Sequence, residues 1–190
     1  MSAELRIESG MLLAAWPDLL DPNFMHSVVL ICQHSEQGAY GLVTNRSTEL
    51  RVKELLPDHP ILGASELPVY LGGPVDHSTL QFLHVVPDEI PGGVCLDGRL
   101  WLGGSLEALA RFVCENDERS RSALRLFLGY SGWSAGQLEA ELGLGSWIPA
   151  PLDLEAVFGP PGEPAWRRLV RSLGGPAAGL ENHPPDLSWN

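Results

Sequence analysis

The sequence has no apolar segment long enough to cross a membrane. Its longest clean apolar stretches, such as Val28 to Cys32, fall far short of the roughly 20 residues that span a bilayer. The first residues, Met1 to Glu4, also lack the basic segment and the long apolar segment of a secretory signal. We therefore expect a soluble, cytoplasmic protein.

Cysteine is scarce as well. The chain contains three cysteines, Cys32, Cys95 and Cys114, and no C-x-x-C pair. An odd number of widely spaced cysteines argues against a disulfide framework, so we expect three reduced thiols packed in the interior. The histidines show neither the i,i+4 pairing nor the nearby cysteine that zinc sites use. The sequence therefore predicts no metal and no cofactor.

Basic side chains are few: 12 lysines and arginines stand against 24 acidic residues, which gives a formal net charge of −12. A field of that sign repels a phosphate backbone unless the cations gather on one face. The local cluster of Arg167, Arg168 and Arg171 lies near the end of an expected helix, where cations are favoured for structural reasons. We do not expect direct nucleic-acid binding. A protein or a small ligand is the expected partner, and the oligomeric state stays open.

Nucleotide-binding loops are missing too. Gly72-Gly73-Pro74 follows an expected strand and Gly103-Gly104-Ser105 opens an expected helix, where free amides can hold an anion. Neither segment matches G-x-G-x-x-G or the lysine-containing P-loop, so both are interpreted as tight turns. The residues predicted to form structural turns are Gly38, Gly41, Gly72, Gly73, Pro74, Gly129 and Gly132.

No repeat, low-complexity tract or linker divides the chain, so residues 1–174 are expected to form one domain, followed by an irregular tail at 175–190. Strand-like segments bounded by glycine, proline and other turn residues are expected at 10–15, 27–33, 41–44, 68–71, 80–86, 100–102 and 123–129. Many strands joined by short turns, with helices inserted late, favour an α+β fold. Its sheet is expected to be mixed and mainly antiparallel, with helices packed on it.

Helix signals occur at four places. Thr48 can cap a short helix that runs to Leu56, and Ser105 can start a helix with an apolar stripe at helical spacing. A sharp turn at 130–133 is expected to lead into a third helix, which begins with the S-x-x-Q capping box of Ser134 and Gln137. The last helix is expected at 164–173, with proline in its first turn and glycine after its end.

Four sequence blocks together resemble the YqgE/AlgH family. They are GMLLAAWPDLLDPNFMHSVVL at 10–30, HSEQGAYGLVTNR at 34–46, YLGGPV at 70–75 and FLGYSGWSAGQLEAELGLGSW at 127–147. The similarity runs from about residue 10 to about residue 173, and the GY-x-GW-x-x-GQL-x-x-E block is the most specific part. The resemblance implies a compact α+β fold with a bent, barrel-like sheet in the bacterial cytoplasm. It also brings the label of a transcriptional regulator, from regulation of alginate production, with no chemistry attached.

Two nucleophile arrangements are weaker than their structural alternatives. Ser131 lies in Gly129-Tyr130-Ser131-Gly132-Trp133, with Asp153 and His183 following in hydrolase order, but Trp133 stands where a nucleophile elbow needs glycine. Cys32 and His34 lie two apart on one expected strand and would face the same way. Burial among valine and leucine disfavours the thiolate, so Cys32 is interpreted as packing. His84 is interpreted as a hydrogen-bonded core residue.

What remains is a polar and aromatic set within the family blocks. Its members, expected to share a surface or groove, are His34, Asn45, Arg46, Tyr130, Trp133, Gln137, Glu139 and Trp147. The equal alternative is that both tryptophans are core residues and Gln137 is only a cap. No catalytic residue is assigned, and the leading hypothesis is a non-enzymatic binding or regulatory protein. A hydrolase or transferase near His34 and Tyr130, and a direct transcriptional regulator, are the alternatives.

Overall fold

A ten-stranded sheet forms the body of the molecule in the computed structural model, which describes residues 6–174, 177 and 179–182. The main path of the sheet runs β10-β1-β2-β3-β9-β6-β8-β7, and β5 joins β9 and β4 beside it. The strands are β1 (Leu12–Ala15), β2 (Val28–Ser35), β3 (Gly38–Val43), β4 (Ser47–Arg51), β5 (Pro68–Leu71), β6 (Val75–His84), β7 (Val94–Cys95), β8 (Trp101–Leu102), β9 (Leu124–Ser134) and β10 (Trp147–Ala150). The β5–β9 pair is parallel, whereas the other pairs are antiparallel. The predicted α+β fold with a mixed, mainly antiparallel sheet is confirmed, and the sheet is not closed into a barrel.

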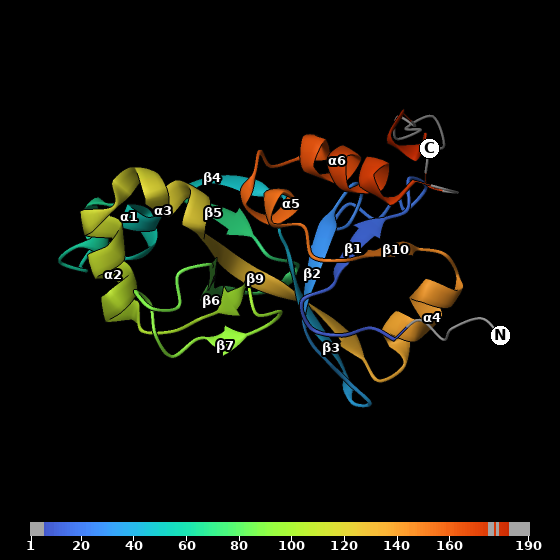
Figure 1. Cartoon of the computed structure of the whole chain (residues 1–190), viewed down its shortest axis with the longest axis horizontal. Coiled ribbons are helices and arrows are strands. Elements are labelled where there is room, and N and C mark those ends of the chain that lie inside the picture. Colours follow the sequence, from blue (N-terminus) through green and yellow to red (C-terminus); the bar gives the residue numbers. More distant parts are fainter. Residues whose placement is uncertain (1–5, 175–176, 178, 183–190) are drawn as a thin grey trace.

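Helices cover the sheet at both ends of the elongated molecule (Figure 1). One end carries α1 to α3, whereas α4 and α6 lie at the other, with α5 between them. The helical elements are α1 (Val52–Leu55), η1 (Leu62–Ala64), α2 (Leu106–Glu115), α3 (Asp117–Ala123), α4 (Gln137–Gly143), α5 (Leu154–Phe158), α6 (Glu163–Leu173) and η3 (Leu180–Asn182). Of the tail predicted to be irregular, 180–182 form a short 3-10 turn, and most of the rest lies outside the described residues. None of the helices among the described residues is long and apolar enough to span a membrane.

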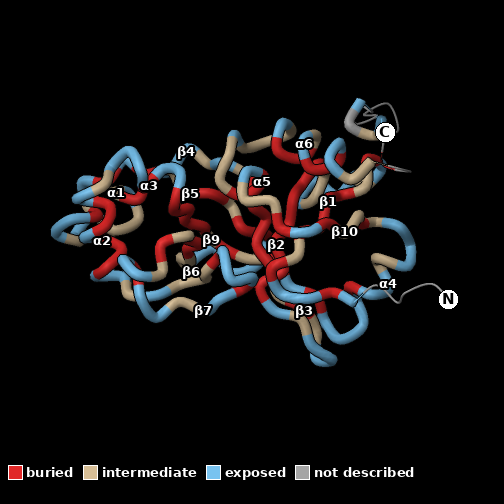
Figure 2. The backbone as a smooth tube through the Cα atoms, in the orientation of Figure 1, coloured by how far each residue is buried: buried red, intermediate tan, exposed pale blue. Residues whose placement is uncertain are grey.

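Three apolar clusters make up the core, and Figure 2 shows buried chain running along the central strands. One lies between the sheet and α5 and α6, with Trp166 fully buried at its centre. A second joins β5, β6 and β9 to α2. The third lies on the α4 side of β1, β2 and β3 and contains Trp133, Leu138 and Trp147. Because β1 and β2 have one cluster on each face, their residues are apolar at nearly every position.

Strand β9 is the longest strand of the sheet, with 11 residues. The sharp turn predicted at 130–133 is wrong, because this segment continues as strand and pairs with β3. Gly41 and Gly129, predicted in turns, also lie inside strands, as does Gly132. At Gly41, glycine is needed for close backbone approach, because a Cβ there would lie 2.7 Å from the Leu30 carbonyl oxygen.

The loop between β5 and β6 contains Gly72, Gly73 and Pro74, where a turn was predicted. Gly38 closes the two-residue turn between β2 and β3, with a φ of 132°. Gly72, Gly73 and Pro74 thus lie in a loop, whereas Gly38 is the first residue of β3, directly after the turn.

The helix predicted from Thr48 to Leu56 is mostly wrong. The segment from Ser47 to Arg51 is strand β4, and only Val52–Leu55 is helical. The Thr48 hydroxyl does not cap a helix but donates to the Val69 carbonyl oxygen at 2.8 Å. Pairing with β5 therefore outweighs the local preference of Thr48 for a helix-capping position.

The other three predicted helices are present in the structure as α2, α4 and α6. The Ser105 hydroxyl caps α2 by accepting from the Ala108 amide, and Trp166, Leu169 and Val170 form the buried face of α6. The capping box before α4 is different from the one predicted. Gly136 is the N-cap residue, and the Gln137 side-chain oxygen accepts from the Ser134 amide at 3.0 Å.

Candidate functional site

A single carboxylate organises the α4 side of the sheet. Glu141 Oε2 accepts from the indole N–H groups of Trp133 at 2.9 Å and of Trp147 at 2.8 Å. Its second oxygen accepts from the Gln137 side-chain amide at 2.9 Å. Both indole rings are almost fully buried, so the carboxylate satisfies donors that water does not reach freely. Glu141 was not in the predicted set, although its i,i+4 spacing from Gln137 could have indicated it.

His34 reaches the same helix from the end of β2. Its Nε2 lies 2.6 Å from Glu139 Oε1, although 105 residues separate the two in sequence. The pKa of Glu139 is lowered by hydrogen bonds, first from its own backbone amide and then from His34. The prediction that His34 and Cys32 share one face of the strand is wrong. A β-bulge between Ile31 and Gln33 reverses the alternation, which puts Cys32 in the α6-side core and His34 opposite Ala39 on the α4 side.

Asn45 and Arg46 form a separate clamp. The Asn45 side chain accepts from the Val28 amide and donates to the carbonyls of His26 and Gly162, so it ties β2 to the start of α6. Arg46 donates to backbone carbonyls of the loop between β1 and β2, at Pro22 and Met25.

This loop connects the clamp to the α4 network. Its Phe24 ring packs against Trp147 at a centroid distance of 5.4 Å and against Trp133 at 6.2 Å. The contact of Arg46 with the network is thus indirect, through the loop that it holds.

Tyr130 lies away from both groups. Its ring packs on Tyr40 at 5.1 Å, and both rings contact the cluster beneath α5 and α6. The structure therefore brings five members of the predicted set together around α4, places two in the neighbouring clamp and puts Tyr130 on the opposite face of the sheet. Those five are His34, Trp133, Gln137, Glu139 and Trp147.

Arg125 is a buried cation that sequence reasoning missed. It lies on β9, 4% exposed, with its guanidinium 4.0 Å from the centre of the Tyr70 ring. Nη1 and Nη2 donate to the carbonyls of Thr44 and Gly159. Burial lowers the pKa of this guanidinium. A charged residue in the middle of an apolar strand run could have indicated this burial. Through these contacts Arg125 joins β3, β5 and the segment before α6.

The nucleophile arrangements lack geometry for catalysis. Ser131 is fully buried and its hydroxyl donates to the Gly72 carbonyl, while Asp153 caps α5 and pairs with Arg168. His183 lies outside the described residues. Burial raises the pKa of the Cys32 thiol, which disfavours the thiolate.

Two further assignments concern packing. His84 is fully buried and bonds to the Gly103 carbonyl, as predicted for a core histidine. Cys95 and Cys114 are exposed, so the prediction that all three thiols pack in the interior is wrong for these two. Cys95 lies on the two-residue strand β7, and Cys114 lies near the end of α2. Among the described residues, no three His, Cys, Asp or Glu side chains converge as a metal site requires.

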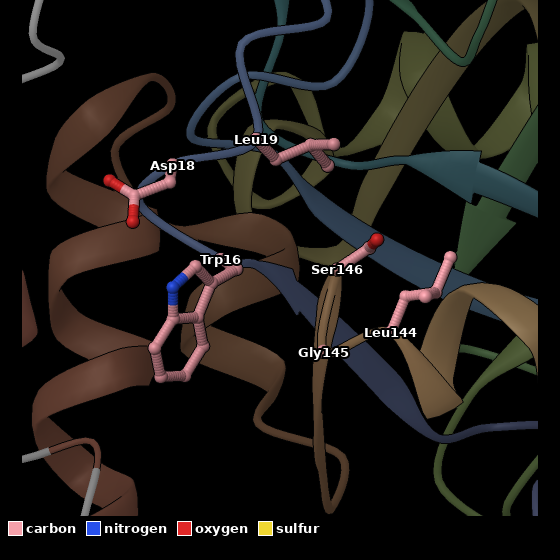
Figure 3. A pocket seen from close by; sticks show the side chains of 6 residues that line it. All are labelled: Trp16, Asp18, Leu19, Leu144, Gly145 and Ser146. Atoms are coloured by element: carbon pink, nitrogen blue, oxygen red, sulfur yellow. The ribbon is translucent and has the colours of Figure 1, made fainter.

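Beside the α4 network lies an open groove of about 500 Å³. Figure 3 shows its lining side chains, which come from the loop after β1 and from the turn between α4 and β10. They are Trp16, Asp18, Leu19, Leu144, Gly145 and Ser146. The Trp16 amide donates to the Ser146 carbonyl at 2.9 Å, so the two sides are joined at the floor. Leu144 is 84% exposed at the edge of this groove.

The sequence profile of the AlgH-like family, DUF179, matches residues 12–178. The chain belongs to the AlgH-like family. A UPF0301 protein of Chlorobaculum tepidum is 41% identical over 180 residues, which cover 94% of this chain and 93% of that protein. A UPF0301 protein of Chlamydia trachomatis is 35% identical over 187 residues, which cover 97% and 96%.

Solved structures agree with the AlgH-like assignment. The solution structure of the AlgH protein from Pseudomonas aeruginosa matches with a TM-score of 0.69 at 30% identity, covering 90% of this chain and 94% of that one. A crystal structure of a Corynebacterium diphtheriae protein matches with a TM-score of 0.76 at 24% identity and covers 94% of each chain, which bears on the fold alone. The names of these relatives state no reaction or ligand.

Proposed function

We propose that this AlgH-like protein is a non-enzymatic binding protein that captures a protein partner in the groove between Trp16 and Leu144. The exposure of Leu144 carries the proposal. A leucine that is 84% exposed at the edge of a groove lined by Trp16 and Leu19 offers apolar surface that a partner can bury.

The family motif supports this location, because its polar residues hold the groove in shape. Glu141 fixes Trp147 at the start of β10, and the Glu141 carbonyl accepts from the Ser146 amide at 3.0 Å. The Ser146 carbonyl in turn accepts a hydrogen bond from the Trp16 amide. A continuous set of hydrogen bonds thus runs from the motif helix to the groove floor. Such support keeps a binding surface preorganised and lowers the entropy lost on association.

The enzyme alternative has less support. A hydrolase or transferase site near His34 and Tyr130 would need these side chains to converge, whereas they lie on opposite faces of the sheet. Direct transcriptional control would need free cations on one face, and on α6 Arg167 pairs with Glu163 and Arg168 with Asp153. Regulation through a captured protein partner requires neither arrangement.

The test compares partners captured by three forms of the full chain: wild type, Leu144→Asp and Val94→Asp. Val94 is a matched control, because it is also an exposed apolar residue, at 63%, but lies on β7 at the other end of the sheet. Each purified protein is incubated with a lysate of the producing bacterium, and bound proteins are quantified by mass spectrometry. Circular dichroism and melting curves first establish that all three forms are folded.

We expect at least one captured protein to fall about tenfold or more with Leu144→Asp while it is retained by Val94→Asp, because a carboxylate cannot be buried without a partner charge. Direct titration of that protein, once purified, must reproduce the difference. Equal capture by all three forms, or loss with both variants, would overturn the assignment of the groove.

A further inference from the structure

Cations are absent from the two sequence segments that build the groove end of the molecule. Residues 7–45 and 126–166 contain no lysine or arginine. The same segments contain nine carboxylates, at Glu8, Asp18, Asp21, Glu36, Glu139, Glu141, Asp153, Glu155 and Glu163. All of β1, β2, β3, β10, α4 and α5 comes from these segments, which carry nine of the 24 carboxylates of the chain and none of its 12 cations.

Arginines from other segments lie near this end, and three of them face carbonyl or carboxylate groups. Arg46 is turned toward the carbonyls of Pro22 and Met25. On α6, Arg167 and Arg168 lie beside the carboxylates of Glu163 and Asp153. The groove lining itself contains one charged side chain, the exposed carboxylate of Asp18.

The groove therefore combines apolar and anionic recognition. Leu19 and Leu144 supply aliphatic contacts, and the neighbouring Leu20 is 47% exposed. Trp16 supplies an aromatic ring and Asp18 a carboxylate on the same groove (Figure 3). An ammonium or guanidinium group is attracted by both an indole face and a carboxylate.

From these features we infer that the docking segment of the partner is basic and amphipathic, with an apolar anchor beside at least one lysine or arginine. This inference rests on the proposed function and names the chemistry of the partner. The apolar anchor fills the space between Leu19 and Leu144, while the cation lies at Asp18 and Trp16. The negative field of the surrounding end of the molecule accelerates association and makes it sensitive to salt.

The test is an unbiased selection of short peptides displayed on phage against the wild-type chain, with counter-selection against Leu144→Asp. We expect enriched sequences to carry net positive charge next to leucine, tryptophan or another large apolar residue. Synthetic versions of the winners are then titrated into isotope-labelled protein. The indole N–H of Trp16 and the amides of Gly145 and Ser146 should shift most.

Two charge reversals separate a local from a general charge effect. Asp18→Lys should weaken the selected peptides by about tenfold, because it places a like charge at the cation position. Asp88→Lys changes the net charge equally but lies between β6 and β7, at the other end of the fold, and should weaken them far less. Equal weakening by both reversals would overturn the role of Asp18.

Other outcomes are equally decisive. Selection of acidic or neutral peptides, selection of none, or shifts mapped away from the groove would overturn the inference. If the lysate experiment still finds a partner that depends on Leu144, the groove stands and only the basic chemistry fails. If neither experiment gives a Leu144-dependent ligand, the proposed function fails as well.

Discussion

The indole groups of Trp133 and Trp147 converge on one carboxylate oxygen, Oε2 of Glu141, and their rings lie 6.2 Å apart in an edge-to-face arrangement. Trp133 lies one residue before the end of β9 and Trp147 begins β10, so the carboxylate joins two strands that are not neighbours in the sheet. Glu141 lies on the helix that connects those strands. The family motif thus has a structural explanation as a buried polar network within an aromatic cluster.

Replacement of Glu141 by alanine should destabilise the protein by about 2–4 kcal/mol, because it leaves two nearly buried indole donors without an acceptor. Glu141→Gln, which keeps a side-chain oxygen, should lose less. Urea unfolding followed by tryptophan fluorescence measures both. Glu139→Ala on the same helix is the control and should cost less than about 1 kcal/mol, because its hydrogen bond with His34 lies at the surface, where the Glu139 side chain is 51% exposed. Equal losses at the two glutamates would contradict the network.

The parts of the fold that follow from local patterns were predictable from the sequence. The stripe of Trp166, Leu169 and Val170 indicated the buried face of α6, and Ser105 indicated the start of α2. These features depend only on residues within a few positions of each other. The α+β class followed in the same way from the spacing of strand and turn signals.

Features that depend on distant partners were not predictable. Segment 47–51 is a strand because β5 pairs with it, and 130–134 continue β9 because β3 lies alongside. The bulge after Ile31 decides which face of the sheet His34 occupies, and the residues of β2 contain no local signal that predicts a bulge. The same reason explains why the candidate site was found only in part. The motif indicated α4 and the two tryptophans on the flanking strands, but the groove depends on contact between Trp16 and Ser146, which are far apart in sequence.

Stability should fall as the pH is lowered below about 6.5, before most carboxylates titrate. Burial lowers the pKa of His26 and of His84; Glu163 opposes this effect at His26, and the Gly103 carbonyl and then Glu89 oppose it at His84. Arg167 lowers the pKa of His26 further. The unfolded chain therefore binds more protons than the folded one just below that pH. The histidine contribution is complete above the unfolded pKa and is lost as pH falls toward the folded pKa values.

The His26→Phe variant tests this origin. Phenylalanine keeps a ring on Trp166, which His26 stacks against at 4.1 Å, and removes the titrating group. The positive φ of 51° at this position should cost the variant some stability at every pH. The readout is therefore the slope of unfolding free energy between about pH 7 and about pH 5.5, which should become smaller. An unchanged slope would exclude His26 as a contributor.

Two of the three cysteine thiols should react quickly with Ellman's reagent in the folded protein. Cys95 and Cys114 are exposed, whereas Cys32 lies in the core and burial raises its pKa. The third thiol should appear only in denaturant. A Cys95→Ser, Cys114→Ser double variant should show no fast phase, and a fast phase in that variant would mean that Cys32 is reached without unfolding.

Two glycines should respond to alanine in opposite directions. Gly73 has a φ of 152°, and an added Cβ would lie 2.2 Å from the Tyr130 carbonyl group. Because a backbone group cannot move away as a flexible side chain can, Gly73→Ala should destabilise by several kcal/mol or prevent folding. Gly143, within α4, has no strained φ and nothing within 4 Å of an added Cβ.

Gly143→Ala should therefore stabilise the protein by about 0.5–1 kcal/mol, through the higher helix propensity of alanine. Urea unfolding of both variants measures the difference. Since Gly143 adjoins Leu144, this variant also tests whether a stiffer end of α4 leaves peptide capture intact. A loss of stability at Gly143 would mean that the helix ends before this residue and that the turn carrying Leu144 needs its conformational freedom.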